Sequence, residues 1–226
     1  MMYKEVKVLE KKPGLKVKPI KNFKYAKDLT QSIITVDEFY KACKTYPIVF
    51  GRDSENNLAA IVLMGVEDKN LFVNSKGEWK KGEYIPFYVR RYPFNFLKQD
   101  DKYILVYDEN SKAINDKEGE ELFDENGEPS EYLKNVLALM ERYQVSAKKT
   151  EEFLKKLEEL GLLEDARINI KRDGKNYVIT PVKKVNEEKL NALGEKEKLE
   201  LVNTGMYKLI IAHLISLDNI QKLALL

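Results

Sequence analysis

The stretch that decides the fold is YPIVFGRDSENNLAAIVLMGV, residues 46–66. Two apolar runs, YPIVFGR and LAAIVLMGV, flank the turn-forming residues DSENN, and this order predicts a β-hairpin. Both runs are apolar at successive positions, so both faces of the two strands are expected to be covered. We therefore expect helices from other parts of the chain to pack on this sheet.

Further strand patterns lie on the C-terminal side of this hairpin. YILVYDE, residues 103–109, has the composition of a strand. RINIKRDGKNYVITPV, residues 167–182, predicts a second hairpin, because Asp173 and Gly174 form a dipeptide that suits a tight two-residue turn.

Helical patterns occupy most of the remaining chain. Ser130 is a good N-cap for a long segment of helical spacing, either one bent helix or two in tandem, that ends at Gly161. Residues 186–226 also read as helices. We therefore predict an α+β fold: a largely antiparallel sheet from about residues 46–108 plus the hairpin at about 167–185, covered by a long helix and a C-terminal helical bundle.

The first 28 residues differ from the rest in composition. They hold nine lysines against three acidic residues, and two prolines and a glycine interrupt any helix. One interpretation is contact with an anionic surface, and the other is a solvated arm that packs its aromatic side chains on the body. We favour the second because the whole chain carries only +2. We predict that residues 1–28 form an extended arm on a single domain, residues 29–226, whose helical part is 186–226.

Chemistry-bearing residues are scarce in the 226-residue chain. Cys43 is the only cysteine and His213 the only histidine, so a zinc or iron–sulfur site rich in these residues cannot be built. Both lie on apolar helix faces, and we expect structural roles for them. The acidic segment 108–131 fails as a calcium loop, because Leu122 and Leu133 would occupy its first and last ligand positions. We expect no metal site.

Motifs for nucleotide and cofactor chemistry are also missing. The chain has no Walker A loop, no dinucleotide-binding glycine pattern and no hydrolase nucleophile elbow. We therefore expect no cofactor and favour a non-catalytic protein, although catalysis by carboxylates alone stays open. The balanced net charge argues against specific binding of nucleic acid. With no secretory signal pattern and no apolar run long enough for a membrane span, the chain is expected to be soluble and cytoplasmic.

The segment GEYIPFYVRRYPFNF, residues 82–96, holds two adjacent arginines among aromatic residues and prolines. A short helix beginning at Pro86 and a strand both suit it, and we favour the helix. In either form Arg90 and Arg91 point in different directions. An internal ion pair is our preferred role for them over ligand binding. The partner- or ligand-binding candidates of this region are Trp79, Tyr84, Tyr88, Arg90, Arg91 and Tyr92.

Several segments together carry a family resemblance. NFKYA (22–26), DEFYKACKTYPIVF (37–50), NLFV with GEW (70–79), YIPFYVRRYPF (84–94), LFDENGEPS (122–130), LEELGLL (157–163) and the tail from residue 185 resemble the SapC family. RRYPF and AHLISLDNIQKLA are the most specific of these matches. The family is bacterial and is named for its association with a surface-layer (S-layer) gene cluster. The resemblance implies a role in S-layer expression or export and supplies no catalytic residues.

Two functions follow from these observations. The leading hypothesis is a soluble, non-catalytic accessory protein that binds a protein partner in S-layer biogenesis or export, because arginine and aromatic residues are favoured anchors of interfaces. The alternative is a small-ligand-binding protein or enzyme with an aromatic and arginine pocket around Trp79–Arg91.

Overall fold

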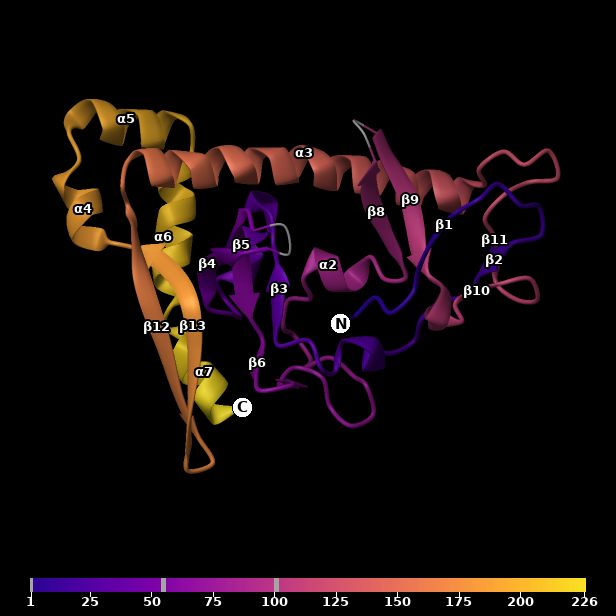
Figure 1. Ribbon diagram of the computed structural model, residues 1–226, viewed down its shortest axis with the longest axis horizontal. Coiled ribbons are helices and arrows are strands. Elements are labelled where there is room, and N and C mark those ends of the chain that lie inside the picture. The colour runs from indigo at the N-terminus through magenta and orange to yellow at the C-terminus, as the bar shows by residue number, and fades with distance from the viewer. Residues whose placement is uncertain (1, 54–55, 100–101) are drawn as a thin grey trace.

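The computed structural model describes residues 2–53, 56–99 and 102–226. A long helix, α3 (Glu131–Glu159), runs along the molecule. The main sheet and the C-terminal helices gather near one end of α3, and the two three-stranded sheets, β1-β9-β8 and β10-β2-β11, lie toward its other end (Figure 1). Helices and antiparallel sheets are thus combined in one chain, which confirms the predicted α+β class.

The main sheet has five strands, each antiparallel to its neighbour. Its strands, in spatial order, are β12 (Leu163–Arg172), β13 (Lys175–Val185), β4 (Ile48–Arg52), β5 (Leu58–Leu63) and β3 (Gln31–Ile33). The predicted hairpin of residues 46–66 is confirmed, with Val49 opposite Ile61. Two residues of its DSENN turn, 54 and 55, lie outside the described part of the chain.

Burial along these strands follows their sequence patterns. Ile48 and Val49 of β4 are both 0% exposed, so both faces of this strand are covered, as predicted. In β12, buried Ile168 and Ile170 alternate with exposed residues, so that strand covers the core with one face only. The second predicted hairpin is also confirmed, and its turn places Asp173 at a positive φ of 49° beside Gly174.

Helix α6 (Met206–Ser216) lies where two strands of the main sheet separate. β13 and β4 are paired only at Lys183 and Phe50 within the described residues. Side chains of α6 form hydrogen bonds with backbone groups of β13 and β4 that do not pair with each other. The imidazole of His213 accepts a hydrogen bond from Val185 N at Nε2 (3.0 Å), and its Nδ1 contacts Ile48 O (2.9 Å). Ile48 N in turn donates to Ser216 Oγ (2.9 Å). His213 thus bridges the two strands where ladder hydrogen bonds are missing.

The predicted strand at residues 103–109 belongs to a separate sheet rather than to the main one. That strand, β9 (Lys102–Asp108), has β8 (Phe94–Gln99) on one edge and β1 (Val6–Val8) on the other. Because both edges of β9 are occupied, it cannot extend the main sheet. The arm therefore supplies the third strand of this sheet, β1.

The residues that the structure describes form two hydrophobic cores, and α3 joins them. The main core lies around the five-stranded sheet and receives Phe153, Leu154 and Leu157 from α3. The minor core receives Leu133 from the other end of α3. Its other buried members are Val17, Phe94, Leu122 and Phe123. Of the two alternatives for this region, one helix or two in tandem, the structure has one continuous helix. Ser130 is its N-cap, and the Ser130 Oγ accepts a hydrogen bond from Leu133 N at 3.2 Å.

Short elements complete the fold. The helical ones are η1 (Lys24–Ala26), η2 (Val36–Glu38), α1 (Phe39–Ala42), α2 (Phe87–Arg90), η3 (Glu109–Ser111), α4 (Glu187–Ala192), α5 (Glu195–Asn203) and α7 (Asn219–Leu225). The remaining strands are β2 (Lys16–Val17), β6 (Gly65–Val66), β7 (Lys69–Asn70), β10 (Ile114–Asn115) and β11 (Glu120–Glu121). Over residues 2–53, 56–99 and 102–226, no helix has both the length and the apolar character that crossing a membrane requires.

Candidate functional site

The segment that carries the two adjacent arginines forms the helix α2, as predicted. Pro86 has an extended ψ of 144° and stands at the N-cap, one residue before its predicted position, and Arg91 is the C-cap. Arg91 N donates to Phe87 O (3.0 Å) and closes the single turn. Successive helical residues project about 100° apart, since the helix has about 3.6 residues per turn, so the two guanidinium groups diverge.

A buried carboxylate, Glu38, organises the surface under α2. Its side chain accepts hydrogen bonds from Tyr84 Oη (2.9 Å) and from Phe87 N (2.8 Å). It also completes a capping box with Thr35, whose backbone N donates to it at 3.0 Å. Glu38 is 5% exposed, so these donors replace the water that a buried carboxylate would otherwise lack. Glu38 therefore fixes the positions of Tyr84 and of the first turn of α2.

Arg90 is exposed and is oriented by neutral groups. Its Nε donates to Ile85 O (2.9 Å), and its Nη2 donates to Tyr84 Oη (3.4 Å). The guanidinium carbon also lies 5.7 Å from the centre of the Tyr84 ring and 5.6 Å from that of Phe87. Burial raises the pKa of the Tyr84 hydroxyl, so Tyr84 stays a neutral link between Glu38 and Arg90.

A hollow of about 180 Å³ opens beside Arg90, between α2 and the middle of α3. Three cations, Arg90, Lys41 and Arg142, and two acids, Asp37 and the buried Glu38, line it, so its side chains carry a surplus of one positive charge. None of the three cations forms an ion pair with another residue in the described part of the chain. The hollow also has apolar walls, including Leu139, which is 46% exposed. We call this feature the arginine pocket; its charge and shape suit an acidic group carried on an apolar stem.

Arg91 has different surroundings from Arg90. Its guanidinium carbon lies 4.7 Å from the centre of the Tyr88 ring and 5.0 Å from that of Tyr143, so two aromatic rings hold it. Within the described residues, no carboxylate lies at ion-pair distance from either arginine. The preferred internal ion pair is therefore not formed there, because Glu38, the nearby buried carboxylate, is bound by Tyr84 and backbone N–H groups instead.

The other two sequence candidates lie outside the arginine pocket. Trp79 is 9% exposed, and its ring packs against Phe23 (5.4 Å between centres) in the main core. Tyr92 stacks on Tyr25 at 4.2 Å, and its hydroxyl donates to Asp108 (2.8 Å). The six candidates are thus divided: Tyr84 and Arg90 line the pocket, Tyr88 and Arg91 lie beside it, and Trp79 and Tyr92 are elsewhere.

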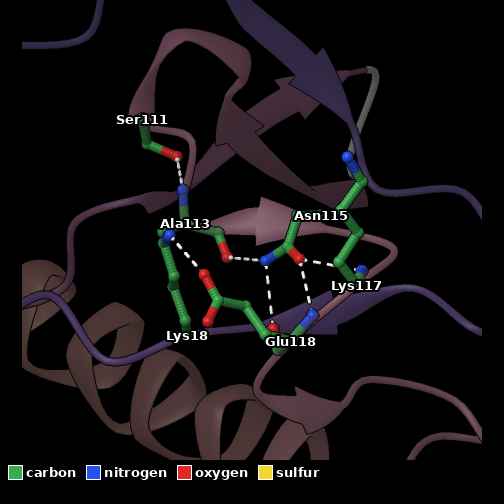
Figure 2. A network of polar contacts seen from close by, with 6 residues as sticks. All are labelled: Lys18, Ser111, Ala113, Asn115, Lys117 and Glu118. Carbon is green, nitrogen blue, oxygen red and sulfur yellow. Dashed lines mark hydrogen bonds and ion pairs between the residues drawn. The ribbon is translucent and has the colours of Figure 1, made fainter.

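A second polar region comprises two adjoining hollows of about 540 and 670 Å³ that share Lys24, Lys27 and Asp28. We call them together the lysine groove. Its first hollow is bounded by Ser111, Ala113 and Lys18, and Figure 2 shows how this wall is held. Lys18 pairs with Glu118 (2.8 Å), and Asn115 donates to Ala113 O (3.1 Å).

Sequence reasoning identified the lysines of the arm but missed the groove. The arm supplies the lysines of the first hollow, whereas Lys69, Lys80 and Arg172 of the second come from distant segments. Nothing in their spacing along the chain relates them to the arm. Only the tertiary structure brings these cations together.

The fold and these contacts define an α+β protein with an arginine–tyrosine pocket and a lysine-lined groove. The chain belongs to the SapC family, whose family model matches residues 10–223. Comparisons with curated proteins and with solved structures gave no match.

Proposed function

We propose that this SapC-family chain is a non-catalytic accessory protein that binds a protein partner in S-layer biogenesis or export in the bacterial cytoplasm. Family membership supports the biological setting, because the family is named for its association with an S-layer gene cluster. The observation that carries the binding role is the arginine pocket. Its Arg90 is exposed, held in place by Tyr84 and Ile85, and not neutralised by a carboxylate of the described residues.

Such an arrangement has the features of an interface anchor. Arginine and tyrosine are over-represented among residues that dominate binding energy, above all where apolar neighbours exclude water. Arg90 has Phe87 beside it and Leu139 across the hollow. A glutamate or aspartate of the partner would meet Arg90, Lys41 and Arg142, and its stem would pack on the apolar wall.

The size of the pocket favours a partner side chain over a free substrate. Small-molecule sites have volumes of about 300–1,000 Å³, whereas the arginine pocket measures about 180 Å³. Trp79, which the alternative hypothesis includes in the same pocket, does not line it. We therefore prefer partner binding over a substrate pocket around Trp79–Arg91.

Co-purification from native extract tests the proposal. The wild type, Arg90→Ala and Arg167→Ala are compared as baits; Arg167 is an exposed arginine on β12, away from the pocket. We expect a stoichiometric partner with the wild type and with Arg167→Ala, and a loss of at least about tenfold in its recovery with Arg90→Ala. Equal recovery on all three baits, or recovery of a tightly bound small molecule without a protein, would contradict the proposal.

A further inference from the structure

The lysine groove concentrates positive charge from four segments of the chain. Of the residues that the structure describes, eight cationic and three acidic side chains line its two hollows. The cations are Lys4, Lys18, Lys21, Lys24, Lys27, Lys69, Lys80 and Arg172, and the acids are Asp28, Glu78 and Asp108. The lining thus has a surplus of five positive side-chain charges, although the whole chain carries only +2. The charge is therefore local to the groove.

Two of the three acids are already bound to neutral donors. Asp108, which is 1% exposed, accepts hydrogen bonds from Tyr92 Oη (2.8 Å) and from the backbone N of Glu5 (3.1 Å). Glu78 accepts from Asn74 Nδ2 (2.8 Å). Only Asp28 has no hydrogen bond or ion pair with another residue in the described part of the chain. Within the described residues, none of the three acids therefore forms an ion pair with a lysine of the groove, and each lowers the positive potential there only from a distance.

Most of the cations are likewise uncommitted. Lys18 pairs with Glu118, and the Nε of Arg172 pairs with Asp173 (3.1 Å). The other six cations of the groove form no ion pair with residues that the structure describes. A concave surface of one charge sign focuses its field into the hollow and raises the local concentration of counter-ions. These ammonium groups are therefore available to an anionic ligand.

The chemistry of the lining selects among anions. The planar fork of arginine pairs bidentately with carboxylates and phosphates alike, whereas lysine is a point charge that binds phosphate oxygens in many orientations. Seven of the eight cations in the described lining are lysines. Each hollow has the volume of a small-molecule site, and Lys24 and Lys27 line both, so the two hollows adjoin. A ligand with one phosphate could use only part of this lining.

We propose that the lysine groove binds a free small molecule that carries two or more adjacent phosphate groups. Lys24 and Lys27 contact the phosphates where the hollows meet, and lysines of both hollows hold the two ends. The stacked rings of Tyr25 and Tyr92, which line the first hollow, offer an apolar wall for the remainder of the ligand. This inference is independent of the arginine pocket, with which the groove shares no lining residue.

Isothermal titration calorimetry of the full chain with tripolyphosphate tests the assignment. Lys24→Gln/Lys27→Gln removes two charges from the shared wall and is expected to weaken binding by at least about tenfold. Lys148→Gln/Lys149→Gln removes the same charge from exposed positions of α3 and is expected to stay within about twofold of wild type. Lys80→Gln, in the second hollow, should weaken binding by about threefold. Citrate, a tricarboxylate of lower negative charge than tripolyphosphate, should bind at least about tenfold more weakly, because it can neutralise fewer ammonium groups at once.

Several outcomes would overturn the proposal. They are no binding of tripolyphosphate, equal affinity for citrate, or equal weakening in the Lys148/Lys149 control. Two further arms distinguish other sources of phosphate: a single-stranded oligonucleotide, and vesicles of phosphatidylcholine with or without phosphatidylglycerol. Binding of either one without binding of tripolyphosphate would assign the groove to nucleic acid or to a lipid surface instead. Thermal melts should show all variants folded, because the substituted lysines are exposed.

Discussion

Protonation of His213 is expected to weaken the fold, because this imidazole bridges two strands only while it is neutral. Its Nε2 accepts a hydrogen bond from Val185 N, which an imidazolium cannot do. Burial lowers the pKa of His213 to about 4 from an ordinary value of 6.5. Between these values the unfolded chain binds a proton that the folded chain does not, so stability falls as the pH falls through this window.

The size of the effect follows from the two pKa values. Each pKa unit is worth about 1.4 kcal/mol, so the full loss approaches about 3 kcal/mol, and about 2.5 kcal/mol of it is reached by about pH 4.5. Above about pH 6.5 the contribution is fully present. His213 is the only histidine in the chain, so no other imidazole contributes to this change.

Urea unfolding of the wild type and of His213→Gln, measured between about pH 7 and 4.5, isolates this contribution. Glutamine keeps an acceptor for Val185 N but does not titrate, and losing the contact with Ile48 O should cost about 2 kcal/mol at about pH 7. Only the wild type loses the stabilisation by neutral histidine as the pH falls. The difference in unfolding free energy between the two proteins should therefore close toward about pH 4.5. Carboxylates titrate in both proteins and cancel. A difference in unfolding free energy that stays constant across this pH range would refute the reasoning.

The remaining predictions concern the stability of variants at the two arginines of α2, at the buried Glu38 and at the N-cap of α3. Arg91→Ala should lower the unfolding free energy by about 2 kcal/mol through loss of its ring contacts, whereas Arg90→Ala should change it by less than about 0.5 kcal/mol; thermal melts that show equal losses would contradict this division. Glu38→Gln should cost about 2 kcal/mol, since an amide NH₂ would face the Tyr84 and backbone donors; urea unfolding measures it, and an unchanged midpoint would contradict the role of Glu38. Ser130→Ala should cost about 1 kcal/mol by removing the N-cap of α3, with Ser130→Thr as the control that retains the hydroxyl; helix content and melting temperature report it, and equal behaviour of the two variants would contradict the capping role.

Local chemistry made much of the fold predictable from the sequence. The apolar runs of residues 46–66 predict β4 and β5, and the Asp173-Gly174 pair predicts the turn between β12 and β13. The cap at Ser130 predicts the start of α3. Each of these features depends on neighbours in the chain, and for this reason each can be read without knowledge of the tertiary structure.

Features that depend on contacts between segments far apart in the sequence could not be predicted from local patterns. The spacing around His213 indicates a buried residue, but its bridging role requires β4 and β13 to diverge at that position. The sheet assignment of β9 depends on which strand pairs with its second edge, and that strand, β1, comes from the arm. Burial of Trp79 and assembly of the lysine groove likewise follow from long-range packing.

The continuity of α3 has a mechanical consequence. Its 29 residues correspond to a rod of about 44 Å at about 1.5 Å per residue. One end is anchored in the minor core by Leu133 and the other in the main core by Phe153, while Leu139 in the span between them is exposed.

A rod fixed at both ends transmits a tilt of either anchor along its whole length, and α3 has no proline or glycine at which it could hinge. The arginine pocket is built on this span, since α3 supplies Leu139, Arg142 and Tyr143 to its lining. We therefore expect a shift of one core against the other to change the width of the arginine pocket. If the proposed partner binds there, its affinity should depend on how the two cores are aligned, because α3 contributes to both cores and to the pocket.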